Sequence, residues 1–85
     1  MNQVNQTTRD LRQELEKSAV LLRKLSDEVR VQLHLGGLEA KDEWRRLEPR
    51  LESVLDRTTR EVSDASHAAV VEITEAVRRL RESLR

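Results

Sequence analysis

The chain has 85 residues and no cysteine, which leaves room for one small domain and excludes disulfide bridges, thiol catalysis and thiolate metal ligands. Sixteen basic and sixteen acidic side chains cancel to a formal net charge of zero, which argues against a general binder of nucleic acid or of anionic membranes. Trp44 is the only aromatic residue, so the stacking platform that single-stranded nucleic acids need is missing as well.

The first predicted element is a long amphipathic helix over about residues 5–35. Its apolar residues are separated mostly by three or four positions or by sums of these, which places them along one stripe at about 100° per residue. The stripe consists of Val4, Leu11, Leu15, Leu22, Leu25 and Val29, with Thr8 and Ser18 in the gaps. This heptad-like seam is typical of a helix that packs in a bundle or a coiled coil. A separate patch of Val20, Val31 and Leu35 falls on the back of the same helix.

A turn is predicted at Gly36 and Gly37, because glycine readily adopts the left-handed conformation that ends many helices. A second helix is predicted over about residues 38–85, because its apolar stripe keeps one phase throughout. The stripe consists of Trp44, Leu47, Leu51, Leu55, Thr58, Val62, Ala65, Ala69, Ile73, Ala76, Leu80 and Leu84. Pro49 removes one helical hydrogen bond, so we predict a kink at residue 49, with a break into a short and a long helix as the alternative.

The predicted fold is all-α, a single helical domain (residues 1–85) in which two long helices form a hairpin. The second segment is about a third longer than the first, so a hairpin leaves roughly fifteen residues without cover. These residues include Ile73, Val77, Leu80 and Leu84, whose burial requires another helix. We therefore predict a homodimer that forms an antiparallel four-helix bundle or coiled coil.

The interface between the copies is expected on the seam of the second helix. Trp44 is the leading candidate, because aromatic residues often contribute most to binding energy. The full predicted set is Trp44, Leu47, Leu51, Val62, Ala69, Ile73, Val77, Leu80 and Leu84.

No combination of residues predicts catalysis, a cofactor or a metal. Asp64 and His67 have the spacing of half a di-iron site in a helical bundle, but both project more than about 100° away from the apolar stripe, onto the solvated side. His34 lies near the end of the first helix, where a cation is favoured by the helix dipole. Long helices with little loop offer no enclosed pocket for a nucleophile, a base and an oxyanion donor. We expect no catalytic residue, no bound cofactor and no metal.

These features predict a non-catalytic oligomeric module that acts in protein–protein interaction or as a scaffold. The expected partner is a second copy, with another helical protein as a further partner and neither nucleic acid nor membrane expected. The alternatives are a small secreted or secretion-linked helical hairpin and a helical protein that lies reversibly on a lipid surface. The polar start lacks the features of a signal peptide, and no apolar run reaches the ~18 to 20 residues of a membrane span. The predicted location is the cytoplasm, with secretion independent of a signal peptide left open.

Overall fold

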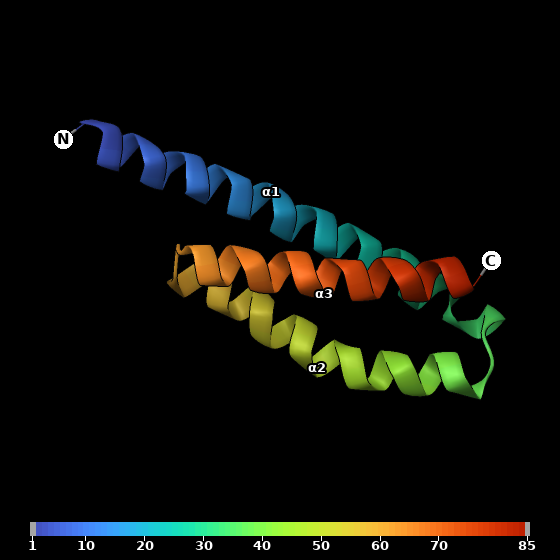
Figure 1. The fold of residues 1–85 in the computed structure, drawn as a ribbon. Helices are drawn as coiled ribbons and strands as arrows, with labels where there is room; N and C mark the ends of the chain where they lie inside the picture. The colour runs from blue at the N-terminus through green and yellow to red at the C-terminus, as the bar shows by residue number, and fades with distance from the viewer. Residues whose placement is uncertain (1, 85) are drawn as a thin grey trace.

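Three α-helices lie side by side in the computed structural model, which describes the backbone of residues 2–84 and the side chains of residues 9–84 (Figure 1). The elements in chain order are α1 (Asn2–Gln32), the 3-10 helix η1 (Leu33–Leu35), α2 (Leu38–Arg60) and α3 (Asp64–Ser83). The described part of the chain contains no strand, so the all-α prediction is confirmed. The side chains of Val4 and Thr8, which the first predicted stripe includes, lie outside the described residues.

The expected single helix over residues 38–85 is not observed. Helix α2 ends at Arg60, and Glu61 and Ser63 adopt extended backbone conformations before α3 begins at Asp64. The chain reverses its direction at this joint, so α3 runs antiparallel to α2 and parallel to α1 (Figure 1). The physical reason is a helix start at Ser63, whose hydroxyl oxygen accepts a hydrogen bond from the backbone N–H of Ser66 at 3.1 Å.

Helix α2 continues through Pro49, so the alternative of a break at that residue is wrong. Pro49 lies on the exposed side of α2, where water can satisfy the backbone carbonyl that the proline leaves without a donor. The predicted kink at this position stays a prediction.

The connection between α1 and α2 contains Gly36 and Gly37, and neither adopts the left-handed conformation that we expected. Their φ angles are −89° and −81°. Gly36 is required for a different reason, because a Cβ atom there would lie 2.6 Å from Cδ2 of Leu84 and 2.8 Å from Cβ of Ala40. Gly37 has open space around it. The tip of the Leu84 side chain can move aside, but Cβ of Ala40 cannot, so close packing against the start of α2 explains the first glycine of the pair.

Helix α3 is the central element, because it packs against both α1 and α2, while α1 and α2 hardly touch each other. The core consists of twelve residues from the three helices and the end of α3: Leu15, Leu22, Leu25, Val29, Trp44, Leu47, Leu51, Val70, Ile73, Val77, Leu80 and Leu84. Helices α1 and α2 meet near the glycine connection and diverge towards the other end of the molecule (Figure 1).

This arrangement removes the reason for a dimer that was drawn from the uncovered end of the second predicted helix. Ile73, Val77, Leu80 and Leu84 are at most 5% exposed, because α3 folds back and buries them within one chain. The part that projects is instead the start of α1, which extends beyond both other helices (Figure 1). Arg9 and Asp10 are exposed there and Leu11 is half-buried, and the core begins only at Leu15.

Candidate interaction surface

The residues predicted for the interface between copies lie in the core of a single chain. Seven of the nine are buried: Trp44, Leu47, Leu51, Ile73, Val77, Leu80 and Leu84. Val62 and Ala69 are half-buried, and Val62 packs against the core. The seam of the predicted second helix therefore holds α1, α2 and α3 together, and in this structure little of it is left for a partner.

Trp44 anchors α2 against the end of α1. Its side chain is 5% exposed, and the guanidinium carbon of Arg30 lies 5.4 Å from the centre of the indole ring. Arg30 also donates hydrogen bonds to Asp27 at 3.1 Å and to Glu48 at 3.2 Å, which hold the cation over the ring. Such a partly exposed cation–π contact contributes about 0.5–1 kcal/mol.

The histidines do not form part of a cluster in the structure. The side chains of residues 9–84 contain no group of three or more His, Asp or Glu residues that could hold a metal ion. The Nδ1 atom of His34 lies 2.8 Å from the carbonyl oxygen of Val31, and because a carbonyl only accepts, Nδ1–H is the donor. His67 is half-buried, and Asp64 lies in the first turn of α3, where a negative charge stabilises the helix.

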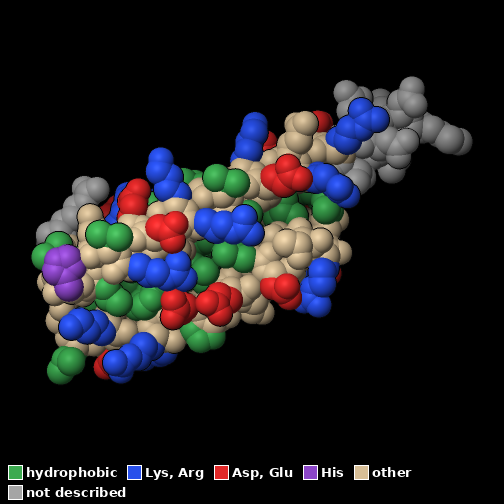
Figure 2. Space-filling model, turned by 180° about the vertical axis from the view of Figure 1, so that it is seen from behind, with side chains coloured by type: hydrophobic (Ala, Val, Ile, Leu, Met, Phe, Trp, Pro, Cys, Tyr) green, Lys and Arg blue, Asp and Glu red, His purple; other side chains and the backbone are tan. Residues whose placement is uncertain are grey.

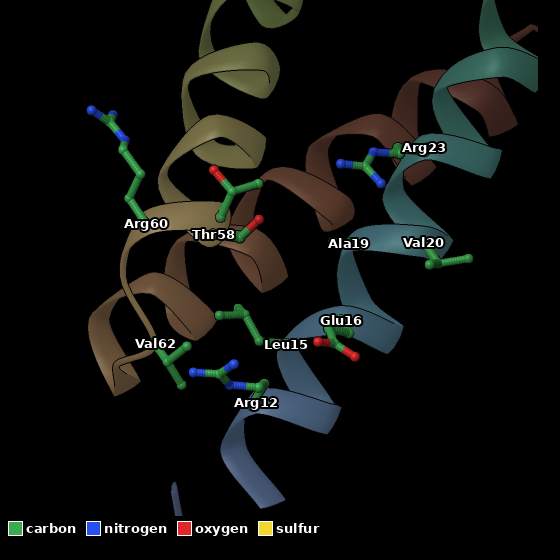
Figure 3. A pocket seen from close by; sticks show the side chains of 10 residues that line it. Arg12, Leu15, Glu16, Ala19, Val20, Arg23, Thr58, Arg60 and Val62 are labelled. Carbon is green, nitrogen blue, oxygen red and sulfur yellow. The ribbon is translucent and has the colours of Figure 1, made fainter. Parts of the chain in front are cut away.

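An open groove of about 430 Å³ lies between the first half of α1 and the end of α2, where these two helices diverge (Figure 3). Its apolar residues are Leu15, Ala19, Val20 and Val62. Its polar residues are Arg12, Glu16, Arg23, Thr58, Thr59 and Arg60. Helix α3 passes behind the open groove in this view (Figure 3).

Three of the four charged side chains at the open groove are arginines, and two of these, Arg12 and Arg23, come from α1. Arg12 and Arg23 turn their guanidinium groups towards the side of the groove that α2 forms, whereas Arg60 points away (Figure 3). Arg60 pairs with Asp56 at 2.7 Å, while Arg12 and Arg23 form no ion pair among the described side chains. An apolar strip with a charged rim is the composition of many non-obligate protein interfaces.

The joint between α2 and α3 forms one end of the open groove, and Glu61 holds it in place. The Oε2 atom of Glu61 accepts hydrogen bonds from Oγ of Ser63 at 2.6 Å, from Nη2 of Arg57 at 2.9 Å and from Oγ of Ser66 at 3.0 Å. These hydrogen bonds, with that from Ser63 the strongest, lower the pKa of Glu61 from 4.5 to about 2. The ionised carboxylate links the last turn of α2 to the first turn of α3 through these hydrogen bonds.

The apolar patch predicted on the back of α1 is exposed in the structure. Val20, Val31 and Leu35 are 61%, 71% and 64% exposed. On the face shown in Figure 2, apolar side chains are separated by charged ones, so they form no broad apolar surface. Val20 also lines the open groove, so this residue of the patch belongs to the candidate binding surface, whereas Val31 and Leu35 do not line the groove.

No known protein family, curated protein or solved structure matches the chain. Over residues 2–84, no helix combines the length and the apolar character needed to cross a membrane.

Proposed function

We propose that the protein is a non-catalytic protein–protein interaction module that associates with itself through the open groove. The supporting observation is the length of α1, which has 31 residues, against 23 in α2 and 20 in α3. At about 1.5 Å per residue, α1 is about 46 Å long and the others about 35 Å and 30 Å. Its first turns therefore stand alone beside an uncovered groove.

Association with a second copy would cover both the projecting first turns of α1 and the open groove. A single helix that projects into water gains little stability from its own hydrogen bonds, so a packing partner favours it. Helices that bind proteins commonly lay an amphipathic face into a groove of this kind. The net charge of zero means that two copies have no overall charge repulsion to overcome.

The proposal is tested by sedimentation equilibrium from micromolar to millimolar concentration, where we expect a reversible dimer. Val20→Glu places a carboxylate at the edge of the open groove and is expected to weaken the dimer at least tenfold, because that charge would lose water on association. Val31→Glu is the matched control, since Val31 lies eleven residues further on the same face of α1, is also exposed and does not line the groove.

A wild-type chain that stays monomeric over this range would refute self-association. Equal weakening by Val20→Glu and Val31→Glu would exclude the open groove as the interface. Circular dichroism of both variants checks that each keeps the helical content of the wild type.

A further inference from the structure

The joint between α2 and α3 is short, and its hydrogen bonds are local. It consists of three residues, Glu61, Val62 and Ser63. Among the described side chains, the hydrogen bonds of the joint reach no further than Arg57 in α2 and Ser66 in α3. The joint contains neither glycine nor proline, so its residues can also adopt helical backbone angles. The local support for the reversal of the chain is therefore one carboxylate and one helix cap.

The buried positions of α2 and α3 would share one face if the joint became helical. Seven buried or half-buried positions follow one another at steps of three or four across the joint: Leu51, Leu55, Thr58, Val62, Ser66, Val70 and Ile73. This spacing defines one face of an α-helix. A straight helix over residues 38–83 would therefore carry one continuous stripe, and it would take α3 away from α1 and α2 of its own chain.

We propose that the joint is a hinge through which two copies of the chain exchange α3. In the exchanged dimer, α2 and α3 of each copy form one helix, and α3 packs against α1 and α2 of the other copy. The contacts that α3 makes within the single chain are re-formed between the copies, so the residues of the core stay buried. This exchange goes beyond the association through the open groove and does not depend on it.

The packing of α3 selects a second copy as the partner. Val70, Ile73 and Val77 are at most 2% exposed, so releasing α3 into water would uncover the largest part of its apolar face. Helices α1 and α2 hardly touch each other, so a chain that has released α3 leaves the place of α3 between them open. The α3 of a second copy has the side chains that fit this place, because it is the same helix.

The projecting start of α1 also suits the exchanged dimer. The backbone of α1 extends past the joint, on the side towards which a straightened α2 would continue (Figure 1). The second copy lies on that side, because the two-fold axis of the exchanged dimer passes close to the two hinges. The first turns of α1, which stand alone in the single chain, then lie on the same side of the hinge as the second copy.

Spin labels at Glu43→Cys and Arg79→Cys measure the opening of the joint within one chain. Both residues are exposed, and neither forms an ion pair among the described side chains. In the hairpin of α2 and α3, the two positions lie on helices about 8–10 Å apart and are offset by about 3 Å along the axis. In one straight helix they are separated by about 54 Å.

The doubly labelled chain is mixed with an excess of unlabelled chain, refolded from urea at millimolar concentration and separated into monomer and dimer by size-exclusion chromatography. The excess of unlabelled chain ensures that each distance is measured within one molecule. Pulsed electron paramagnetic resonance should give the short distance for the monomer and about 54 Å for the dimer.

Two substitutions at the hinge should shift the amount of exchanged dimer in opposite directions. Ser63→Ala removes a cap that only the single chain uses, so it should raise the association constant roughly thirtyfold, about fivefold for each of the two joints. Asp64→Pro suits the single chain, because proline is favoured at the first position of a helix and Ser63 before it is already extended. The same proline would interrupt a straight helix, so this variant should form no exchanged dimer.

A dimer with only the short distance would overturn the exchange of α3 and leave the association through the open groove intact. A long distance that persists in Asp64→Pro would exclude the joint as the hinge. Val20→Glu separates the two modes of association, because it should weaken the groove dimer and leave the exchanged dimer unchanged. A refolded wild-type chain that forms no dimer at millimolar concentration would refute both proposals.

Discussion

Replacing Ser63 by Ala distinguishes the three-helix bundle from an uninterrupted helix over residues 38–85. The two structures predict changes in unfolding free energy of opposite sign. In the bundle, Oγ of Ser63 accepts a hydrogen bond from the backbone N–H of Ser66 at 3.1 Å and donates one to Glu61 at 2.6 Å. Ser63→Ala removes both hydrogen bonds at the start of α3. In an uninterrupted helix residue 63 would lie in the interior, where alanine is favoured over serine.

The expected loss in the bundle is about 1 kcal/mol of unfolding free energy, the usual cost of replacing a serine N-cap by alanine. For a domain of this size, 1 kcal/mol corresponds to a decrease in Tm of roughly 4–8 °C. In the uninterrupted helix the same substitution would raise the unfolding free energy by about 0.5 kcal/mol or less.

Thermal and urea denaturation measure this difference, followed by far-ultraviolet circular dichroism and by the fluorescence of Trp44. Ser53→Ala is the matched control, because Ser53 is exposed within α2 and makes no cap, so we expect a slight gain in stability. A Ser63→Ala variant as stable as the wild type, or more stable, would refute the helix start at Ser63 and with it the position of α3.

Three further predictions use neighbouring residues or pH. Leu22→Ala, at a fully buried position, should lower the unfolding free energy by about 2–5 kcal/mol. Leu21→Ala, at a position that is 42% exposed, should lower it by less than about 1 kcal/mol. Similar urea midpoints for the two variants would contradict the packing of α1. Gly36→Ala should lower Tm, because the new methyl group would overlap Ala40 and Leu84, and Gly37→Ala should leave Tm nearly unchanged. The reverse order of the two Tm values would contradict the close packing around Gly36. Because folding lowers the pKa of Glu61 from 4.5 to about 2, its contribution to stability is present above pH 4.5 and is lost as the pH falls towards 2. The stability of Glu61→Gln should therefore fall less than that of the wild type over this range, and parallel urea midpoints would exclude the role of the carboxylate.

The buried face of α1 and of the first half of α2 could be predicted from the sequence, whereas in α3 the predicted Ala65 is exposed and Val70, outside the predicted stripe, is fully buried. Leu15, Leu22, Leu25 and Val29 were assigned to the stripe of the first helix, and all are buried in α1. This part succeeds because the face that a residue occupies depends on helical geometry alone, which spacing reports directly.

The reversal at residues 61–63 could not be predicted from apolar spacing. The stripe keeps its phase across Val62, and the joint contains neither glycine nor proline. The available signal was Ser63 followed by Asp64, a helix start with an acidic residue in the first turn. Folding α3 back buries Ile73 and Val77 within one chain, which avoids the loss of translational freedom that recruiting another copy would require.

The open groove could not be predicted either, because it results from the divergence of α1 and α2. Arg12, Glu16 and Arg23 lie beside the apolar stripe of α1, in positions that a sequence pattern assigns to the solvated face. Only the tertiary arrangement shows that these residues surround an apolar strip.

The central position of α3 has a consequence for protein synthesis. The ribosome makes α1 and α2 first, yet these helices hardly touch each other and share α3 as their common packing partner. Until residues 64–84 have emerged, Leu22 of α1 and Leu51 of α2 lack the helix against which both α1 and α2 pack. The nascent chain therefore folds late, and a translation product that stops before Asp64 would be a substrate for chaperones and proteases.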